Sequence, residues 1–166
     1  MSRGVRYALL GFALADDAQL LGELTDAVAS TGIQSTSTTQ IETWKTQITL
    51  LKRCTCDLIE RHEAAKGWHL ILEYELPRRQ KRPDAILLAE DVILVIEFKV
   101  GATSHDASSR WQVEDYCLNL RDFHGGSSGR AIVPVLCSTA APSVTSSPPI
   151  SISCVAPIRL TNADDL

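Results

Sequence analysis

Apolar residues recur at helical intervals over residues 40–62, and this spacing predicts a long helix. Two shorter segments precede it, an apolar one at residues 7–14 and an amphipathic one at residues 20–28. The Ser/Thr-rich stretch at residues 30–39 is typical of a loop. The apolar positions of the long helix are Ile41, Trp44, Ile48, Leu51, Leu58 and Ile59.

Extended segments dominate the middle of the chain. Residues 68–76 are rich in β-forming residues, residues 84–88 are short and apolar, and residues 92–100 are the most hydrophobic run. The connection Ala89-Glu90-Asp91 between the last two segments is short enough for a hairpin. Gly101 marks the end of the last run.

The second half of the chain predicts a helix at residues 107–123 and a fourth strand at residues 131–137. The Ser/Pro/Ala-rich residues 138–149 are expected to be a linker, and residues 150–160 are a candidate for one more strand. The order is therefore helix, three strands, helix and strand. It predicts an α/β fold with a mixed central sheet flanked by helices.

The domain organisation follows from this order. Residues 40–137 are expected to hold the core, residues 1–39 to pack on it as an N-terminal extension, and residues 138–166 to contribute the linker and an extra strand. The net charge of -4 provides no general basic field for nucleic acid, although a local basic patch is compatible with it.

Composition also limits the setting in which the protein works. No stretch approaches the roughly 18 consecutive apolar residues of a membrane span, and no signal peptide is recognisable, so neither a membrane partner nor export is expected. The five cysteines contain no CxxC pair, which argues against a zinc knuckle or a disulfide framework. A reducing cytoplasm is the expected location.

Candidate chemistry lies at the end of the most hydrophobic strand. Side chains alternate along a strand, so Glu97 and Lys99 project to one face while Ile96 and Phe98 project to the other. If the hairpin turns at Glu90 and Asp91, Asp84 lies opposite Glu97, about 5 Å away between Cβ atoms. Two carboxylates at that distance repel each other unless a proton or a cation lies between them.

A hard divalent cation with oxygen ligands, such as Mg²⁺, resolves this repulsion. Lys99 would then stand beside the ion, where it could orient a water molecule or stabilise charge that develops on a phosphate. The alternative is an ordinary Glu97–Lys99 ion pair, with Asp84 capping a turn after Pro83. A shift of one residue in the hairpin would abolish the direct pairing.

A dense basic cluster precedes Asp84 and consists of Arg78, Arg79, Lys81 and Arg82. As a functional patch it would bind phosphates and steer the scissile bond toward the metal. As a structural feature it would be a solvated turn.

Gln112 and Tyr116 lie four residues apart on the second long helix and face the same way. In the structural alternative they decorate a helix whose core side is Trp111, Leu118 and Leu120. Trp44 and Trp111 are expected to pack the helices on the sheet.

The motifs RPD (residues 82–84), IEFK (residues 96–99) and WQVEDY (residues 111–116) together resemble the PD-(D/E)xK nuclease superfamily. The spacing Q-x-x-x-Y further resembles its RecB-like branch. Residues 40–136 are similar to an uncharacterised bacterial family that places a nuclease-like region before a P-loop helicase domain. The similarity implies a restriction-endonuclease-like αβββαβ core.

The resemblance implies roles for individual residues. Asp84, Glu97 and the backbone carbonyl of Phe98 would bind Mg²⁺ or Mn²⁺, and Lys99 would assist the attacking water. Gln112 and Tyr116 would line the site and contact the substrate or the metal-bound water. The superfamily often adds an acidic residue, for which the candidates are Glu42, Glu60, Glu73 and Glu75.

The sequence departs from its relatives in two respects. It lacks the four-cysteine spacing that holds an iron–sulfur cluster in some RecB-like members, so no cluster is expected. It also has no GxxxxGK[ST] motif, so a helicase would be another domain or another subunit, because the chain is either a fragment or a protein that acts alone.

The expected activity is hydrolysis of phosphodiester bonds in nucleic acid, most readily DNA, for DNA processing, repair or defence. Two alternatives remain open. One is a catalytically silent nuclease-like domain that binds nucleic acid or a protein partner. The other is a scaffold that forms a homodimer.

Overall fold

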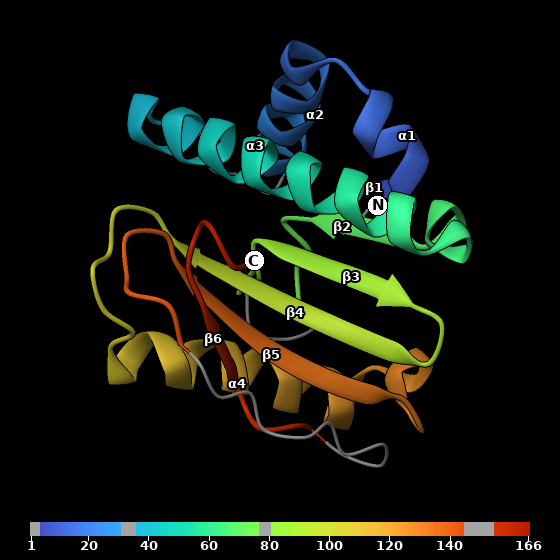
Figure 1. The fold of residues 1–166 in the computed structure, drawn as a ribbon, viewed down its shortest axis with the longest axis vertical. Coiled ribbons are helices and arrows are strands. Elements are labelled where there is room, and N and C mark those ends of the chain that lie inside the picture. The colour runs from blue at the N-terminus through green and yellow to red at the C-terminus, as the bar shows by residue number, and fades with distance from the viewer. Residues whose placement is uncertain (1–3, 31–35, 77–80, 145–154) are drawn as a thin grey trace.

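A six-stranded mixed sheet with helices on both faces organises the chain in the computed structural model (Figure 1), which describes residues 4–30, 36–76, 81–144 and 155–166. The strands are β1 (Val5–Ala8), β2 (His69–Leu72), β3 (Ala85–Ala89), β4 (Val92–Lys99), β5 (Ala131–Ser138) and β6 (Arg159–Thr161). The helices are α1 (Leu9–Leu14), α2 (Asp17–Ala29), α3 (Thr38–Arg61) and α4 (Ala107–Phe123), with short 3₁₀ turns η1 (Glu63–Gly67) and η2 (Gly125–Ser127). The predicted α/β class is therefore confirmed.

The strands follow one another across the sheet in chain order, from β1 to β6. Neighbours are antiparallel from β1 to β4, and β4, β5 and β6 are parallel. Parallel neighbours need a long crossover connection, and α4 provides it between β4 and β5. The predicted order of helix, three strands, helix and strand corresponds to α3, β2, β3, β4, α4 and β5.

The hairpin of β3 and β4 has the predicted register. Ala89 pairs with Val92 across the Glu90-Asp91 turn, and Ala85 pairs with Ile96. If this register is continued by one position beyond the Ala85–Ile96 pair, Asp84 lies opposite Glu97. The site residues on these two strands are thus aligned by a two-residue turn and by the alternation of buried side chains.

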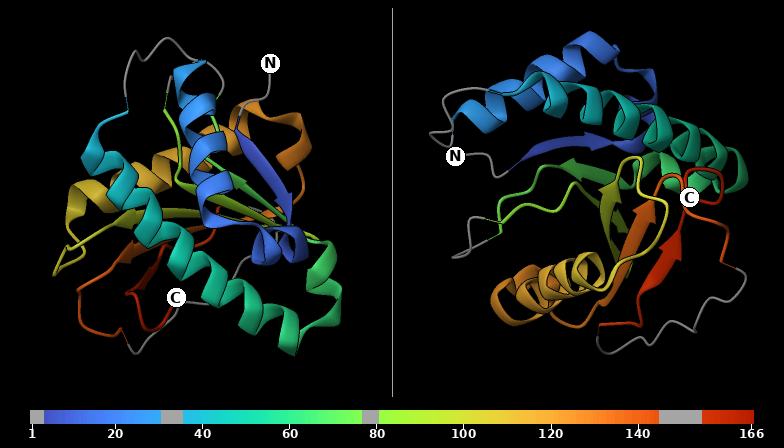
Figure 2. Two further views of the ribbon diagram at one scale, coloured as in Figure 1. Left: turned by 90° about the horizontal axis from the view of Figure 1, so that it is seen from above. Right: turned by 90° about the vertical axis from the view of Figure 1, so that its left-hand side faces the viewer.

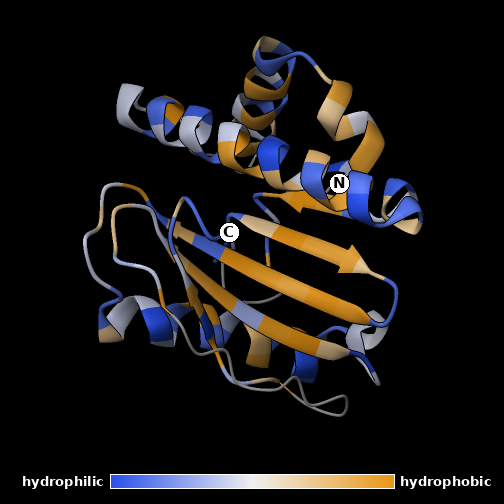
Figure 3. Ribbon diagram, in the orientation of Figure 1, coloured by the Kyte–Doolittle hydropathy of each residue, from blue (hydrophilic) through white to orange (hydrophobic). Residues whose placement is uncertain are grey.

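Helices cover the sheet on both faces, as Figure 2 shows. One core cluster joins α1, α2 and α3 to the sheet, and the other joins α4 to the opposite face. Figure 3 shows β3, β4 and β5 as apolar along most of their length, as expected for strands that are buried on both faces. All eight residues of β5 are buried. Among the described helices, none is long and apolar enough to cross a membrane.

Three sequence-based expectations need correction. The first strand, β1, lies in a region read only as an apolar segment, and it exists because Val5 to Ala8 pair with β2 residues distant in sequence. Residues 68–76 form a strand only at His69–Leu72, since Glu73 has a positive φ of 51° that turns the chain. Trp111, expected in the core, is 74% exposed, because α4 presents Val113, Cys117 and Leu120 to the sheet instead.

The C-terminal strand is shorter than predicted. Within residues 150–160, β6 begins only at Arg159, and Val155 makes an isolated parallel bridge with Ile132. Residues 150–154 lie outside the described part of the chain.

Candidate active site

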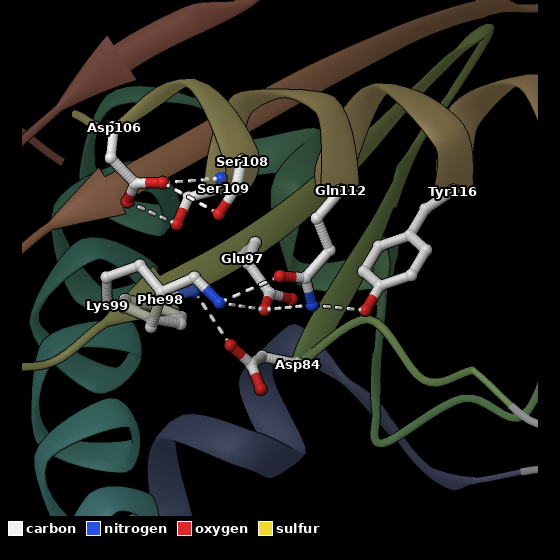
Figure 4. Close-up of polar contacts among 9 residues, drawn as sticks. All are labelled: Asp84, Glu97, Phe98, Lys99, Asp106, Ser108, Ser109, Gln112 and Tyr116. Carbon is white, nitrogen blue, oxygen red and sulfur yellow. Dashed lines mark hydrogen bonds and ion pairs between the residues drawn. The ribbon is translucent and has the colours of Figure 1, made fainter.

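The predicted site residues on β3, β4 and α4 converge at one place, at the C-terminal end of β4 (Figure 4). Asp84 immediately precedes β3, and Glu97 and Lys99 end β4. Gln112 and Tyr116 descend from α4 toward them. The three side-chain tips of Asp84, Glu97 and Lys99 are therefore gathered rather than splayed apart.

Local backbone contacts fix the end of β4. The carbonyl oxygen of Lys99 accepts hydrogen bonds from the N–H groups of Ala102, at 3.1 Å, and Thr139, at 3.2 Å. Gly101 has a φ of 78° and donates its N–H to Thr139 Oγ1 at 2.7 Å. Glycine adopts this left-handed backbone conformation easily, so β4 ends where the sequence predicts. Lys99 consequently has a firmly held backbone.

The two carboxyl groups occupy an environment that disfavours two negative charges. Burial raises the pKa of Asp84 well above its usual range, and the charge of Glu97 raises it further. Burial also raises the pKa of Glu97, although Lys99 opposes this shift. The N–H of Phe98 donates to Asp84 Oδ2 at 2.7 Å. This hydrogen bond stabilises the charged form of Asp84, but the pKa of Asp84 remains raised. A bound cation would favour ionisation of both groups.

Lys99 and Gln112 form a continuous polar network on Glu97. Lys99 Nζ donates to Glu97 Oε1 at 3.0 Å and to Gln112 Oε1 at 2.9 Å. Gln112 Nε2 donates to the same Glu97 oxygen at 2.8 Å and to the hydroxyl of Tyr116 at 2.6 Å. Burial and the charge of Glu97 raise the pKa of Tyr116 to about 12, so this hydroxyl is neutral near pH 7. The sequence-predicted pair on α4 is thus brought to the carboxylates.

The first turn of α4 is held by a capping group that Figure 4 also draws. Asp106 is the N-cap, and its carboxylate accepts from the Ser109 N–H at 2.9 Å and from the Ser109 hydroxyl at 2.6 Å. The Ser108 hydroxyl donates to it at 2.9 Å. These hydrogen bonds hold the pKa of Asp106 far below its usual range, and the hydrogen bond from the Ser109 hydroxyl contributes most. The cap fixes where α4 starts and hence where Gln112 lies.

One carboxylate oxygen of Glu97 has no hydrogen-bond partner in the part of the chain that the structure describes. Glu97 is only 5% exposed, and its Oε2 atom is buried without a hydrogen bond among the described residues. A buried carboxylate oxygen normally requires a donor or a metal ion. Oxygen donors from Asp84 and Glu97 suit a hard cation such as Mg²⁺ or Mn²⁺.

The Phe98 carbonyl is a third oxygen on the same side. In a strand, the N–H and C=O of one residue point toward the same neighbour, and the N–H of Phe98 points to Asp84. Within the described residues no group of three or more His, Cys, Asp or Glu side chains is arranged to hold a metal. The ligand set would thus be two carboxylates, this carbonyl and water, which is usual for Mg²⁺.

Among the four candidates for an additional acid, Glu73 is placed at the site. Its charge raises the pKa of both Asp84 and Glu97, and its Oε1 accepts from Trp44 Nε1 at 2.8 Å. Burial raises the pKa of Glu73 as well. Glu42 is instead an exposed partner of Lys45, and Glu60 is exposed. Glu75 is half-buried.

Gln47 on α3 is a site residue that the sequence reasoning missed. It is 5% exposed, and its side chain hydrogen-bonds to Asp84, which lowers the pKa of that carboxyl. The available signal was its position: Gln47 lies three residues after Trp44 and four before Leu51, on the apolar stripe of the helix. A polar residue on a buried stripe requires a polar partner, and here the partner is Asp84.

The basic segment before Asp84 is only partly described. Arg78 and Arg79 lie outside the described residues. Lys81 Nζ forms an ion pair with Asp115 Oδ2 on α4 at 3.0 Å, and the charge of Arg82 lowers the pKa of Glu73. Contact of these side chains with phosphate remains a prediction.

Arg82 and Glu73 also line a depression of about 290 Å³ beside the first turns of α3. Its other lining residues are Val28, Thr36, Ser37, Gln40 and Trp44. A further cavity of about 430 Å³ lies between α3 and the sheet and contains none of the predicted site residues.

Comparison of the chain with protein-family models, with curated proteins and with solved structures found no match. The candidate site therefore has to be interpreted from its own geometry and chemistry.

Proposed function

We propose that this protein is a metal-dependent nuclease of the PD-(D/E)xK type that hydrolyses phosphodiester bonds of nucleic acid, with DNA as the expected substrate. The observation that carries the proposal is the convergence of Asp84, Glu97 and Lys99, together with a buried Glu97 oxygen that has no partner among the residues described by the structure. Gln112 and Tyr116 complete the set. Paired carboxylates beside an ammonium group suit cation-assisted hydrolysis of phosphates.

Each residue has a role that its contacts support. Asp84, Glu97 and the Phe98 carbonyl would hold Mg²⁺ or Mn²⁺, and the ion would supply Lewis acidity and lower the pKa of a water molecule. Lys99 would place its ammonium next to the attacking water and stabilise negative charge on the phosphate. Gln112 positions that ammonium through its 2.9 Å hydrogen bond. Tyr116 holds Gln112 through its neutral hydroxyl.

Cleavage of DNA by purified wild type and Lys99→Ala tests this proposal. Wild type should cut single- or double-stranded DNA with Mn²⁺ or Mg²⁺ and lose the activity in EDTA. Removal of the Lys99 ammonium should slow cleavage by about 100-fold or more, as expected for a group that stabilises charge in the transition state. Lys45→Ala, an exposed lysine on α3, is the control and should retain full activity. If wild type and Lys99→Ala cut equally, the proposal is wrong.

A second function, binding of nucleic acid or a protein partner without cleavage, is favoured by one observation. Glu97 Oε1 already receives donors from both Lys99 and Gln112, so a purely structural network would partly neutralise this carboxylate. Calorimetry separates the two functions. A nuclease site should bind Mn²⁺ and lose this binding in Asp84→Asn, whereas the silent domain should bind no Mn²⁺ in either form.

A further inference from the structure

The sheet face that packs against α3 is only partly covered at the hairpin of β3 and β4. On the opposite face α4 helps to bury Ile93 and Val95, which are 3% and 0% exposed. Their neighbours Val92 and Leu94 point to the α3 face and are only partly buried. In Figure 1 no described helix lies in front of this part of the sheet. An uncovered apolar face on central strands is typical of an interaction site.

Two adjoining depressions follow this face and form one apolar groove. Their volumes are about 430 Å³ and about 370 Å³, and Leu58, Leu87 and Leu94 line both of them. The floor of the groove follows β4 from Ile96 through Leu94 to Val92. At about 3.3 Å per residue this run spans roughly 13 Å. Seven residues of an α-helix span roughly 10 Å, so the apolar positions of two helical turns match the length of the floor.

Acidic side chains border the groove. They are exposed and form no ion pair within the part of the chain that the structure describes, and they are Asp57 on α3, Glu90 and Asp91 in the hairpin turn, and Asp164 and Asp165 after β6. Among the described residues that line either depression, Arg61 alone is basic. The rim of the groove is therefore complementary to a cationic partner.

We propose that this groove binds a basic amphipathic helix of a protein partner, with aliphatic side chains on the floor and lysines or arginines against the rim. A second copy of this chain fits less well, because a twofold contact would bring the same carboxylates together. Glu97 and Lys99 alternate with Ile96 along β4, so they project from the other face of the sheet. Binding in the groove is therefore separate from the proposed cleavage of nucleic acid.

A designed helix tests the proposal by fluorescence anisotropy. The probe is a dye-labelled peptide of about 14 residues built from Leu, Lys and Ala, with leucines at positions i, i+3, i+4 and i+7. Wild type should bind it at least about tenfold more tightly than a peptide of the same composition whose leucines are scattered around the helix. Leu58→Gln should weaken binding by about tenfold, because one apolar contact is lost. Leu14→Gln, at a 78% exposed leucine of α1, is the matched control and should bind as wild type does.

The acidic rim is tested by the double variant Asp57→Asn and Asp91→Asn. Removal of both charges should weaken binding by about three- to tenfold and reduce its dependence on salt, whereas Asp26→Asn on α2 should change neither. Both rim positions are exposed, so this variant tests the proposal even where Leu58→Gln does not fold.

Several outcomes would overturn the proposal. Equal binding of the two peptides, or wild-type affinity in both Leu58→Gln and the rim variant, would show that the groove holds no basic amphipathic helix. Displacement of the peptide by an equal concentration of octylammonium would assign the groove to a small apolar cation instead. Self-association in gel filtration that the peptide reverses would assign it to a second copy of the chain.

Discussion

Asp84 bears the main electrostatic cost of the site at the scale of single residues. Its carboxyl accepts the Phe98 N–H and a hydrogen bond from Gln47, yet burial and the charge of Glu97 still raise its pKa. The charged form is thus less stable in the folded protein than in the unfolded chain. A buried carboxyl group whose charged form destabilises the folded protein is typical of a functional site. A bound cation would offset this cost at Asp84.

Asp84→Asn should stabilise the metal-free protein at about pH 8, by an amount on the order of 1 kcal/mol. Because the folded-state pKa is raised, wild type loses stability as pH rises from the ordinary Asp pKa of about 3.9 through the raised pKa. Below that range both forms of residue 84 are neutral, so the difference should vanish. Urea unfolding in EDTA at about pH 3 and pH 8 measures this.

The control for this experiment is Asp26→Asn, at an exposed position of α2, which should change little at either pH. Saturating Mn²⁺ should reverse the order at about pH 8, because only wild type has both carboxylates to bind it. Equal or lower stability of Asp84→Asn in EDTA at that pH would contradict the raised pKa.

At the scale of elements, the parts of the fold that depend on local pattern were predictable. The bounds of α4 agree with the predicted residues 107–123, and the hairpin register agrees because a two-residue turn and the alternation along β4 leave little freedom. These two elements position Asp84, Glu97, Lys99 and Gln112. Most of the candidate site was therefore accessible from the sequence.

What the sequence did not reveal depends on packing between distant segments. The pairing of β1 with β2 and the approach of Gln47 to Asp84 both arise from how α3 and the N-terminal segment lie on the sheet. Trp111 was misplaced because α4 has apolar residues around much of its circumference. The face that became buried was decided by the sheet and by the bonds of Gln112, not by the count of apolar residues.

Glu90→Gly should stabilise the hairpin by about 0.5–1 kcal/mol, because a left-handed residue costs roughly 1–2 kcal/mol and the added chain entropy of glycine offsets only part of this. Glu90 has a φ of 49° in the turn and is exposed, so no buried contact is lost. The control is Asp91→Gly. The φ of Asp91 is not positive, so this substitution should destabilise the folded protein by about 0.5–1 kcal/mol. Urea unfolding of both variants measures the effect; equal destabilisation would contradict the turn and hence the register.

At the scale of the whole molecule, the proposed function requires the site to attract a polyanion to a protein with a net charge of -4. Long-range attraction is therefore weak, and binding depends on cations near the opening of the site. Lys81, Arg82 and Lys99 are the described cations that adjoin Asp84 and Glu97 in sequence or by contact. Salt should consequently affect binding through a few local contacts.

The affinity for a single-stranded oligonucleotide should fall with salt with a log–log slope of about -2, since each neutralised phosphate contributes about -0.7 and three contacts are expected. Lys81→Ala should reduce the size of this slope by about 0.7. Fluorescence anisotropy of a dye-labelled strand in EDTA, from about 50 to 200 mM salt, measures it. Lys45→Ala, on the exposed side of α3, should keep the wild-type slope. If both variants keep it, Lys81 contacts no phosphate and the strand follows another path.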